Sequence, residues 1–169
     1  MKTLTTTAGL GVNLASTGGT TTGRPLRVLH VFPTFANGGV PLRIVDVANR
    51  LPPGFSHSCI ALDGRVEAAA RLDPGTPWRV LEPGEGRASW PRQVAAADRR
   101  LRGEAADVLC TYNWGAIDWA FANNWLSRRP HLHFESGFGP EEARATLRRR
   151  DIFRRVALAR TSALIVPSH

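Results

Sequence analysis

Short apolar runs alternate along this chain with stretches in which apolar residues recur every three or four positions. The apolar runs predict six strands, at residues 26–32, 58–62, 78–81, 107–111, 131–134 and 163–166. The stretches between them predict helices at residues 40–51, 66–72, 89–103, 114–127 and 141–160. This alternation predicts an α/β fold, in which a Rossmann-like parallel sheet carries helices on both faces.

The predicted connections bring three loops to one edge of this sheet. Right-handed crossovers place the carboxyl ends of parallel strands on a common edge, and ligands of doubly wound folds bind along that edge. The loops with Gly38 and Gly39, with Asn113 and Trp114, and with residues 135–139 all follow predicted strands. We therefore expect the functional site at this edge.

Gly38-Gly39 lies between the first predicted strand and the first predicted helix. The opening N–H groups of a helix have no partner within the helix, and they carry partial positive charge. An anion such as phosphate suits that position, and glycine allows it to approach the backbone closely. The pair can equally be an ordinary strand-to-helix turn. The pattern GxGxxG is absent, so a dinucleotide fingerprint is not indicated.

The other two loops carry polar and aromatic side chains. Strand alternation puts His133 and Glu135 on one face. His133 can be a hydrogen-bonded core residue, whereas Glu135 is costly to bury alone and could bind sugar hydroxyls or neutralise an arginine. Asn113 can cap the following helix while Trp114 packs in the core. The alternative is a platform on which the indole ring stacks against a sugar and the amide binds its hydroxyls.

Length and charge limit the possible partners. The 169 residues, 43% of them hydrophobic, suit one globular domain, and the net charge of +8 admits nucleic acid, an anionic membrane or phosphate-bearing ligands. In predicted helix 141–160 we expect one buried and one basic face, namely Ile152, Phe153 and Val156 against Arg144, Arg148 and Arg155. The basic face, between Arg144 and Arg160, is either solvated or docked on an anionic membrane. No nucleic-acid-binding module is recognisable.

Cysteines and the amino-terminal segment point to a reduced compartment. Cys59 and Cys110 fall in predicted strands, so we expect two buried thiols in a cytoplasmic protein, with no metal-ligand spacing. No apolar run approaches the roughly 20 residues that span a bilayer. Residues 1–24 are rich in Thr and Gly and predict a disordered leader before a domain at residues 25–169.

Four segments together carry a family resemblance. They are RVLHVFPTFANGGVPLRIVDVANRL (27–51), Asp107-Val108 with Tyr112-Asn113-Trp114-Gly115, HFESGFGP (133–140) and ALIVPS (163–168). Over residues 25–169 the chain resembles the N-terminal domain of the family 4 glycosyltransferases, whose two-domain architecture is called GT-B. The resemblance implies transfer of a sugar from a nucleotide-diphosphate sugar to a hydroxyl acceptor, with retention at the anomeric carbon and with no metal or other cofactor. It also implies a role in polysaccharide or glycolipid assembly.

The resemblance also implies residue roles in this sequence. Gly38 and Gly39 would supply backbone N–H groups to the donor diphosphate or to the acceptor, and Asn37 would add a side-chain contact. Glu135 and Ser136 would stand at the catalytic position. The remaining implied substrate contacts are Asn113, Trp114 and Gly137. Many relatives have histidine or an acidic residue where Ser136 stands, and serine keeps a hydrogen bond there but loses charge and basicity.

The resembled enzymes also contain a second, donor-binding domain. One domain needs roughly 100–200 residues, so the resemblance implies that this chain is the acceptor-side half and is inactive alone. Its partners would be a nucleotide sugar and a glycan or lipid-linked acceptor. Alternatives are a non-catalytic subunit or truncated remnant that pairs with a separate GT-B C-terminal domain, a hydrolase or epimerase of the same architecture, and a basic nucleic-acid binder. A catalytic carboxylate pair would favour the hydrolase or epimerase, and none is convincing.

Overall fold

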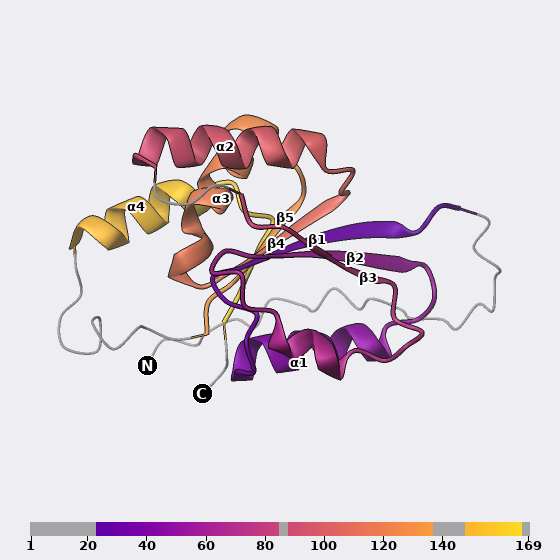
Figure 1. Ribbon diagram of the computed structural model, residues 1–169. Helices are drawn as coiled ribbons and strands as arrows, with labels where there is room; N and C mark the ends of the chain where they lie inside the picture. Colours follow the sequence, from indigo (N-terminus) through magenta and orange to yellow (C-terminus); the bar gives the residue numbers. More distant parts are fainter. Residues whose placement is uncertain (1–22, 85–87, 137–147, 167–169) are drawn as a thin grey trace, which may run out of the picture.

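Six parallel strands form the sheet of the computed structural model, which describes residues 23–84, 88–136 and 148–166. The strands are β1 (Leu26–Phe32), β2 (Phe55–Ala61), β3 (Trp78–Leu81), β4 (Val108–Tyr112), β5 (His131–Phe134) and β6 (Ala163–Ile165). They lie in the order β3-β2-β1-β4-β5-β6 (Figure 1). The predicted α/β, Rossmann-like fold class is therefore confirmed. The strand order reverses at β1: β2 and β3 lie on one side of it, and β4, β5 and β6 lie on the other. Doubly wound folds bind ligands at such a switch point, here between β1 and β4.

Strand bounds follow the predicted ones closely. β1, β3 and β5 begin and end at the predicted residues, β4 is shifted by one residue, and β6 is one residue shorter. β2 begins three residues earlier than predicted because Phe55 already pairs with Leu26, at the start of β1. Two of the three residues that the prediction left out, Ser56 and His57, are polar, so the apolar pattern began only after them.

The helices are α1 (Gly39–Arg50), η1 (Glu67–Arg71), α2 (Trp90–Gly103), η2 (Trp114–Ala116), α3 (Ile117–Ala122), η3 (Asn123–Ser127) and α4 (Arg148–Leu158). Two predicted helices are irregular. The first, at 66–72, is the 3₁₀ helix η1, and the second, at 114–127, is a 3₁₀ turn, a short α-helix and a π turn in succession. Two side chains of the π turn bind backbone carbonyls elsewhere in the fold. Asn123 Nδ2 donates to the Arg129 carbonyl at 3.0 Å, and Asn124 Nδ2 donates to the Ala157 carbonyl at 2.8 Å.

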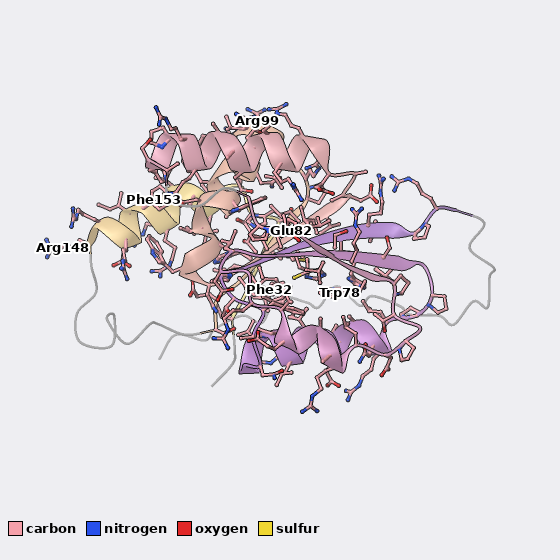
Figure 2. All side chains as sticks on the ribbon, viewed as in Figure 1. Phe32, Trp78, Glu82, Arg99, Arg148 and Phe153 are labelled. Atoms are coloured by element: carbon pink, nitrogen blue, oxygen red, sulfur yellow. The ribbon has the colours of Figure 1, made fainter. Side chains whose placement is uncertain are left out.

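Helices cover both faces of the sheet, as predicted. Figure 1 shows α1 on one face and α2, α3 and α4 on the other. On the α1 side, Phe32, Phe35 and Tyr112 are buried with Ile44 and Val45, and Figure 2 shows Phe32 and Trp78 pointing into this layer. On the opposite side, the core contains Leu29, Val31, Ile60, Val94, Leu101 and Leu109. Side-chain alternation along β1 therefore serves two separate apolar layers.

Helix α4 packs on the core through a different face from the one that the sequence predicted. Phe153, Ala157 and Leu158 pack against α3, whereas Ile152 and Val156 are 63% and 43% exposed. The expected buried stripe was therefore wrong for these two residues and correct for Phe153. Arg148 and Arg155 are exposed, as predicted. Arg144 and residues 141–147 lie outside the described part.

Both cysteine thiols are buried and free, as predicted for Cys59 and Cys110. Burial raises the pKa of each thiol to about 12, so neither is a reactive thiolate at neutral pH. No helix in the described ranges is long and apolar enough to cross a membrane. The predicted leader at residues 1–24 lies outside the described residues, except for Gly23 and Arg24. The guanidinium of Arg24 binds the carboxylate of Asp107 through two hydrogen bonds of 2.7 Å.

Candidate functional site at the carboxyl edge of the sheet

The loops after β1, β4 and β5 meet at the carboxyl edge of the sheet, as the sequence predicted. Pro33 follows β1 and touches Gly115, in the turn after β4, so closely that an added Cβ would lie 2.7 Å from the proline ring. Asn113 links the same turn to the loop after β5, because its backbone N–H donates to the Phe134 carbonyl at 2.7 Å. These contacts join Pro33, residues 113–115 and residues 134–136, the parts of the three loops next to the strand ends, into a rim along β1, β4 and β5.

Gly38 and Gly39 begin helix α1 at this rim. Gly38 is extended, with φ −145° and ψ 167°, and no side chain caps the helix there. A Cβ on Gly39 would meet nothing within 4 Å, and one on Gly38 would make only ordinary contacts. The described fold therefore gives no steric reason for glycine at either position. Pro41 has no N–H, so Gly39 and Val40 supply the first helical donors. Asn37, beside them, is exposed.

Asn113 has a backbone conformation that L-residues rarely adopt, with φ 55° and ψ −179°. Its side-chain Oδ1 accepts a 2.9 Å hydrogen bond from the Ser136 N–H. The expectation that this side chain caps the following helix was wrong, because it binds the neighbouring loop instead. Such strain costs on the order of 1–3 kcal/mol and is typical of functional turns. At Asn113 the strained backbone accompanies the hydrogen bond to Ser136, which joins the loops after β4 and β5.

Glu135 lies at the end of β5, on the same face as His133, as strand alternation predicted. Its Oε2 is 3.5 Å from His133 Nε2 and 3.5 Å from Arg154 Nε, and its side chain is only 14% exposed. His133 is fully buried, and its Nδ1 lies 2.7 Å from Thr111 Oγ1. Of the two roles considered for Glu135, neutralising an arginine is the one that the structure shows. His133 is a hydrogen-bonded core residue.

Trp114 is half-buried, beside two arginines of α4. The guanidinium carbons of Arg150 and Arg154 are each 5.3 Å from the centre of its ring system, and Phe153 meets it edge-on at 6.0 Å. Cation–π contacts of this kind hold an arginine head over an indole. Arg154 consequently connects Trp114 to Glu135, so two predicted site residues share one basic partner.

A pocket of about 700 Å³ opens beside Trp114. Its walls come from the helices α2, η2, α3 and α4, which follow β3, β4 and β5. The lining residues are Trp90, Trp114, Gly115, Ile117, Asp118, Arg149, Arg150 and Phe153. The Trp90 Nε1 group donates a 2.9 Å hydrogen bond to Asp118 Oδ1, which fixes one wall. We call this space the rim pocket. It combines flat aromatic rings, guanidinium groups and one carboxylate.

A second pocket, of about 460 Å³, lies at the opposite edge of the sheet. It is lined by residues from the starts of β1, β2 and β3, such as Arg27, His57 and Trp78. Arg79 and Glu104 in its wall form an ion pair at 3.3 Å. No residue predicted from the sequence lines it, and ligands of this fold bind at the carboxyl edge. The rim pocket is therefore the better candidate.

The sequence found only part of this site. Of the predicted residues, only Trp114 lines the rim pocket. Asn113, Glu135 and Ser136 are connected to it by the contacts described above but are not part of its wall. Asn37, Gly38 and Gly39 do not line the pocket either, and Gly137 is outside the described residues. The missed residues are Trp90, Asp118, Arg149, Arg150 and Phe153. The feature they share is their position in α2, α3 and α4, the helices on one face of the sheet. In the described ranges, no three His, Cys, Asp or Glu side chains are grouped to hold a metal ion.

Comparison with solved structures supports the fold. The chain is similar to the UDP-GlcNAc 2-epimerase from Rickettsia bellii (TM-score 0.54, 18% identity over 86% of this chain). It is also similar to the enzyme of that name from Methanocaldococcus jannaschii (TM-score 0.50, 14% identity over 84%). The chain spans only 40% and 39% of their lengths. No protein-family model matches the sequence, and no curated protein matches it significantly. At these identities the likeness shows a GT-B-like Rossmann fold.

Proposed function

We propose that this chain is the N-terminal lobe of a GT-B-type enzyme that acts on nucleotide sugars. The observation that carries the proposal is the set of contacts that join the loops after β1, β4 and β5, with the rim pocket beside them. The similarity to nucleotide-sugar epimerases in fold supports the same class. The finer proposal is a retaining transferase that resembles family 4 and moves a sugar to a hydroxyl acceptor.

The start of helix α1 and the rim pocket would play different parts in transfer. The N–H groups of Gly39 and Val40 suit the diphosphate of the donor, because glycine leaves the backbone open to close approach. The rim pocket suits the acceptor, since indole rings pack against sugar faces and guanidinium groups bind phosphate. Catalysis would then come from positioning and from stabilising the leaving diphosphate.

Glu135 and Ser136 would act mainly through position. Glu135 already contacts Arg154 and His133, so it holds Arg154 beside Trp114 and the rim pocket. The backbone of Ser136 is held by Asn113, which leaves its hydroxyl for a substrate hydrogen bond. Asn37 is exposed beside the helix start and could add a contact there. None of these groups requires a metal ion in the proposed reaction.

The second candidate is an epimerase, and the similarity in fold to two UDP-GlcNAc 2-epimerases favours it. An epimerase would change the donor sugar without an acceptor, whereas a transferase would consume the donor only when an acceptor is present. Proton NMR of UDP-GlcNAc incubated with the enzyme separates the two, because inversion at C2 changes the anomeric coupling.

Catalysis in either case would need a second lobe, in the same polypeptide or in a partner. We expect the 169-residue chain to show no turnover of UDP-sugars, and clear transfer or epimerisation by this chain would contradict that expectation. Co-purification of a second GT-B lobe would identify a separate partner.

A binding experiment tests the proposed phosphate contact directly. Saturation-transfer NMR with UDP would be recorded on the chain, on Gly39→Ala and on Gly75→Ala. Both glycines have open space where a Cβ would stand, and Gly75 precedes β3 at the opposite edge. We expect UDP binding to weaken severalfold only in Gly39→Ala, with unchanged unfolding midpoints in both variants. Equal binding by the two variants would exclude the phosphate contact at α1.

A further inference from the structure

Helix α4 has two apolar faces, and only one of them is used by the fold. Phe153, Ala157 and Leu158 pack on α3. On the outer side, Ile152 is 63% exposed and Val156, one turn further on, is 43% exposed. Exposed aliphatic side chains at this spacing form a stripe along the helix. The internal packing that the described residues show gives no reason for this stripe.

Arginines surround the exposed stripe. Arg148 and Arg149 precede it, Arg155 lies beside it and Arg160 follows, all of them exposed. Figure 2 shows Arg148 pointing away from the molecule at the first turn of α4. Asp151, the acidic residue of α4, is held by Arg154 at 3.3 Å. Arg148, Arg149 and Arg155 form no ion pair with any described carboxylate.

An indole ring extends the same surface at the end of α4. The Trp125 Nε1 group donates a 3.0 Å hydrogen bond to the Val156 carbonyl, so the ring lies beside the last turns of α4. The Arg160 guanidinium is 4.3 Å from the centre of that ring. Leu126, the next residue, is 44% exposed. We call the surface made by Arg148, Arg149, Ile152, Arg155, Val156 and Trp125 the α4 surface.

From this combination we propose that the α4 surface docks on an anionic lipid bilayer, with Ile152 and Val156 entering the headgroup region. A basic amphipathic helix lies in the membrane interface when apolar side chains are flanked by arginines. Indole rings also favour that depth. Nucleic acid fits less well, because phosphates would account for the arginines and leave the aliphatic stripe in water.

Docking would bring the rim pocket to the bilayer. Arg149 belongs both to the α4 surface and to the wall of the rim pocket, and Phe153 lies in that wall one residue from Ile152. An acceptor that is anchored in the membrane and carries a phosphate could therefore enter the pocket directly. Binding to lipid needs neither a sugar donor nor turnover, so its test is independent of the proposed enzyme function.

The test is flotation of the chain with vesicles of phosphatidylcholine alone, or mixed with phosphatidylserine. We expect binding to the mixed vesicles only. The variant Arg148→Gln/Arg155→Gln should bind about 30-fold more weakly, at roughly 1 kcal/mol for each cation. Ile152→Ser/Val156→Ser should lose about tenfold or more. The matched control is Arg92→Gln/Arg99→Gln, which removes two exposed arginines from α2 and should bind as the unmodified chain does.

Several results would overturn the proposal. Equal binding to both vesicle types, or an equal loss in the control variant, would leave only general attraction of a basic chain. Preferential binding of a DNA duplex, with no flotation, would assign the surface to nucleic acid. Concentration-dependent dimers that Ile152→Ser/Val156→Ser abolishes, again without flotation, would assign it to a second copy. Far-UV circular dichroism of every variant checks that the fold is retained.

Discussion

Acid should destabilise this fold well before its carboxylates titrate, because two of its histidines are buried in neutral form. His30 has Nδ1 2.7 Å from Tyr112 Oη and Nε2 3.0 Å from His57 Nδ1. His131 contacts Thr111 and Asn124 in a similar way. Burial, with a smaller contribution from a neighbouring histidine, lowers the pKa of His30 and of His131 from 6.5 to about 3.

The direction and size of the effect follow from proton uptake. In the unfolded chain both rings have a pKa near 6.5, so between pH 7 and pH 5 that state binds almost one proton at each ring, while the folded state binds none. Stability is therefore lost as the pH falls, by about 2 kcal/mol for each histidine and about 4 kcal/mol together. That loss is large beside the ~5–15 kcal/mol by which domains are stable.

Urea unfolding followed by tryptophan fluorescence at pH 7, 6 and 5 measures this loss. The variant His30→Phe keeps an aromatic ring in the stack with Phe32 and Tyr112 but cannot titrate. It should be less stable at every pH, because Tyr112 loses a partner, yet its loss between pH 7 and 5 should be smaller by about 2 kcal/mol. A loss in the unmodified chain below about 1 kcal/mol, or an unchanged slope in His30→Phe, would refute buried neutral histidines.

Three further outcomes are expected. Gly115→Ala should lower the free energy of unfolding by about 1–3 kcal/mol because its Cβ would overlap a proline ring, whereas Gly39→Ala should be neutral or slightly stabilising; equal urea midpoints would argue against that contact. Asn113→Ala should be less stable than Asn113→Gly, since only glycine tolerates the positive φ, and the reverse order would remove the strain argument. Cys59 and Cys110 should react with Ellman's reagent only after unfolding, and fast labelling of the native chain would show that the thiols are accessible.

Hydrophobic periodicity was enough to predict the sheet and most of the helices. It located β1, β3 and β5 to the residue because each strand directly follows a proline and ends before a proline or a glutamate. It also predicted the common edge, since parallel strands joined by helices have little topological freedom. It did not predict the broken helix after β4, where the residues involved have partners distant in the sequence: Gly115 contacts Pro33, 82 positions away, and Asn124 binds the Ala157 carbonyl.

Side-chain partners were harder to predict than backbone elements. The amide of Asn113 was expected at a helix start, yet it binds the next loop, because that loop offers an N–H in the correct place. Ile152 and Val156 were expected in the core because they are aliphatic and lie near Phe153. The orientation of α4 is instead set by Phe153 and Ala157 against α3, together with the contact between Arg154 and Glu135. Tertiary contacts of this kind leave no local signature.

The hydrogen bond from Ser136 to Asn113 has a mechanical consequence. Trp114 is the very next residue, so this hydrogen bond links the aromatic wall of the rim pocket to the end of β5. We expect a ligand that displaces one of these loops to displace the other as well, because the hydrogen bond and the strained backbone of Asn113 resist their separation. Ligand binding at the loop after β4 should therefore also change the position of the loop after β5, and the reverse.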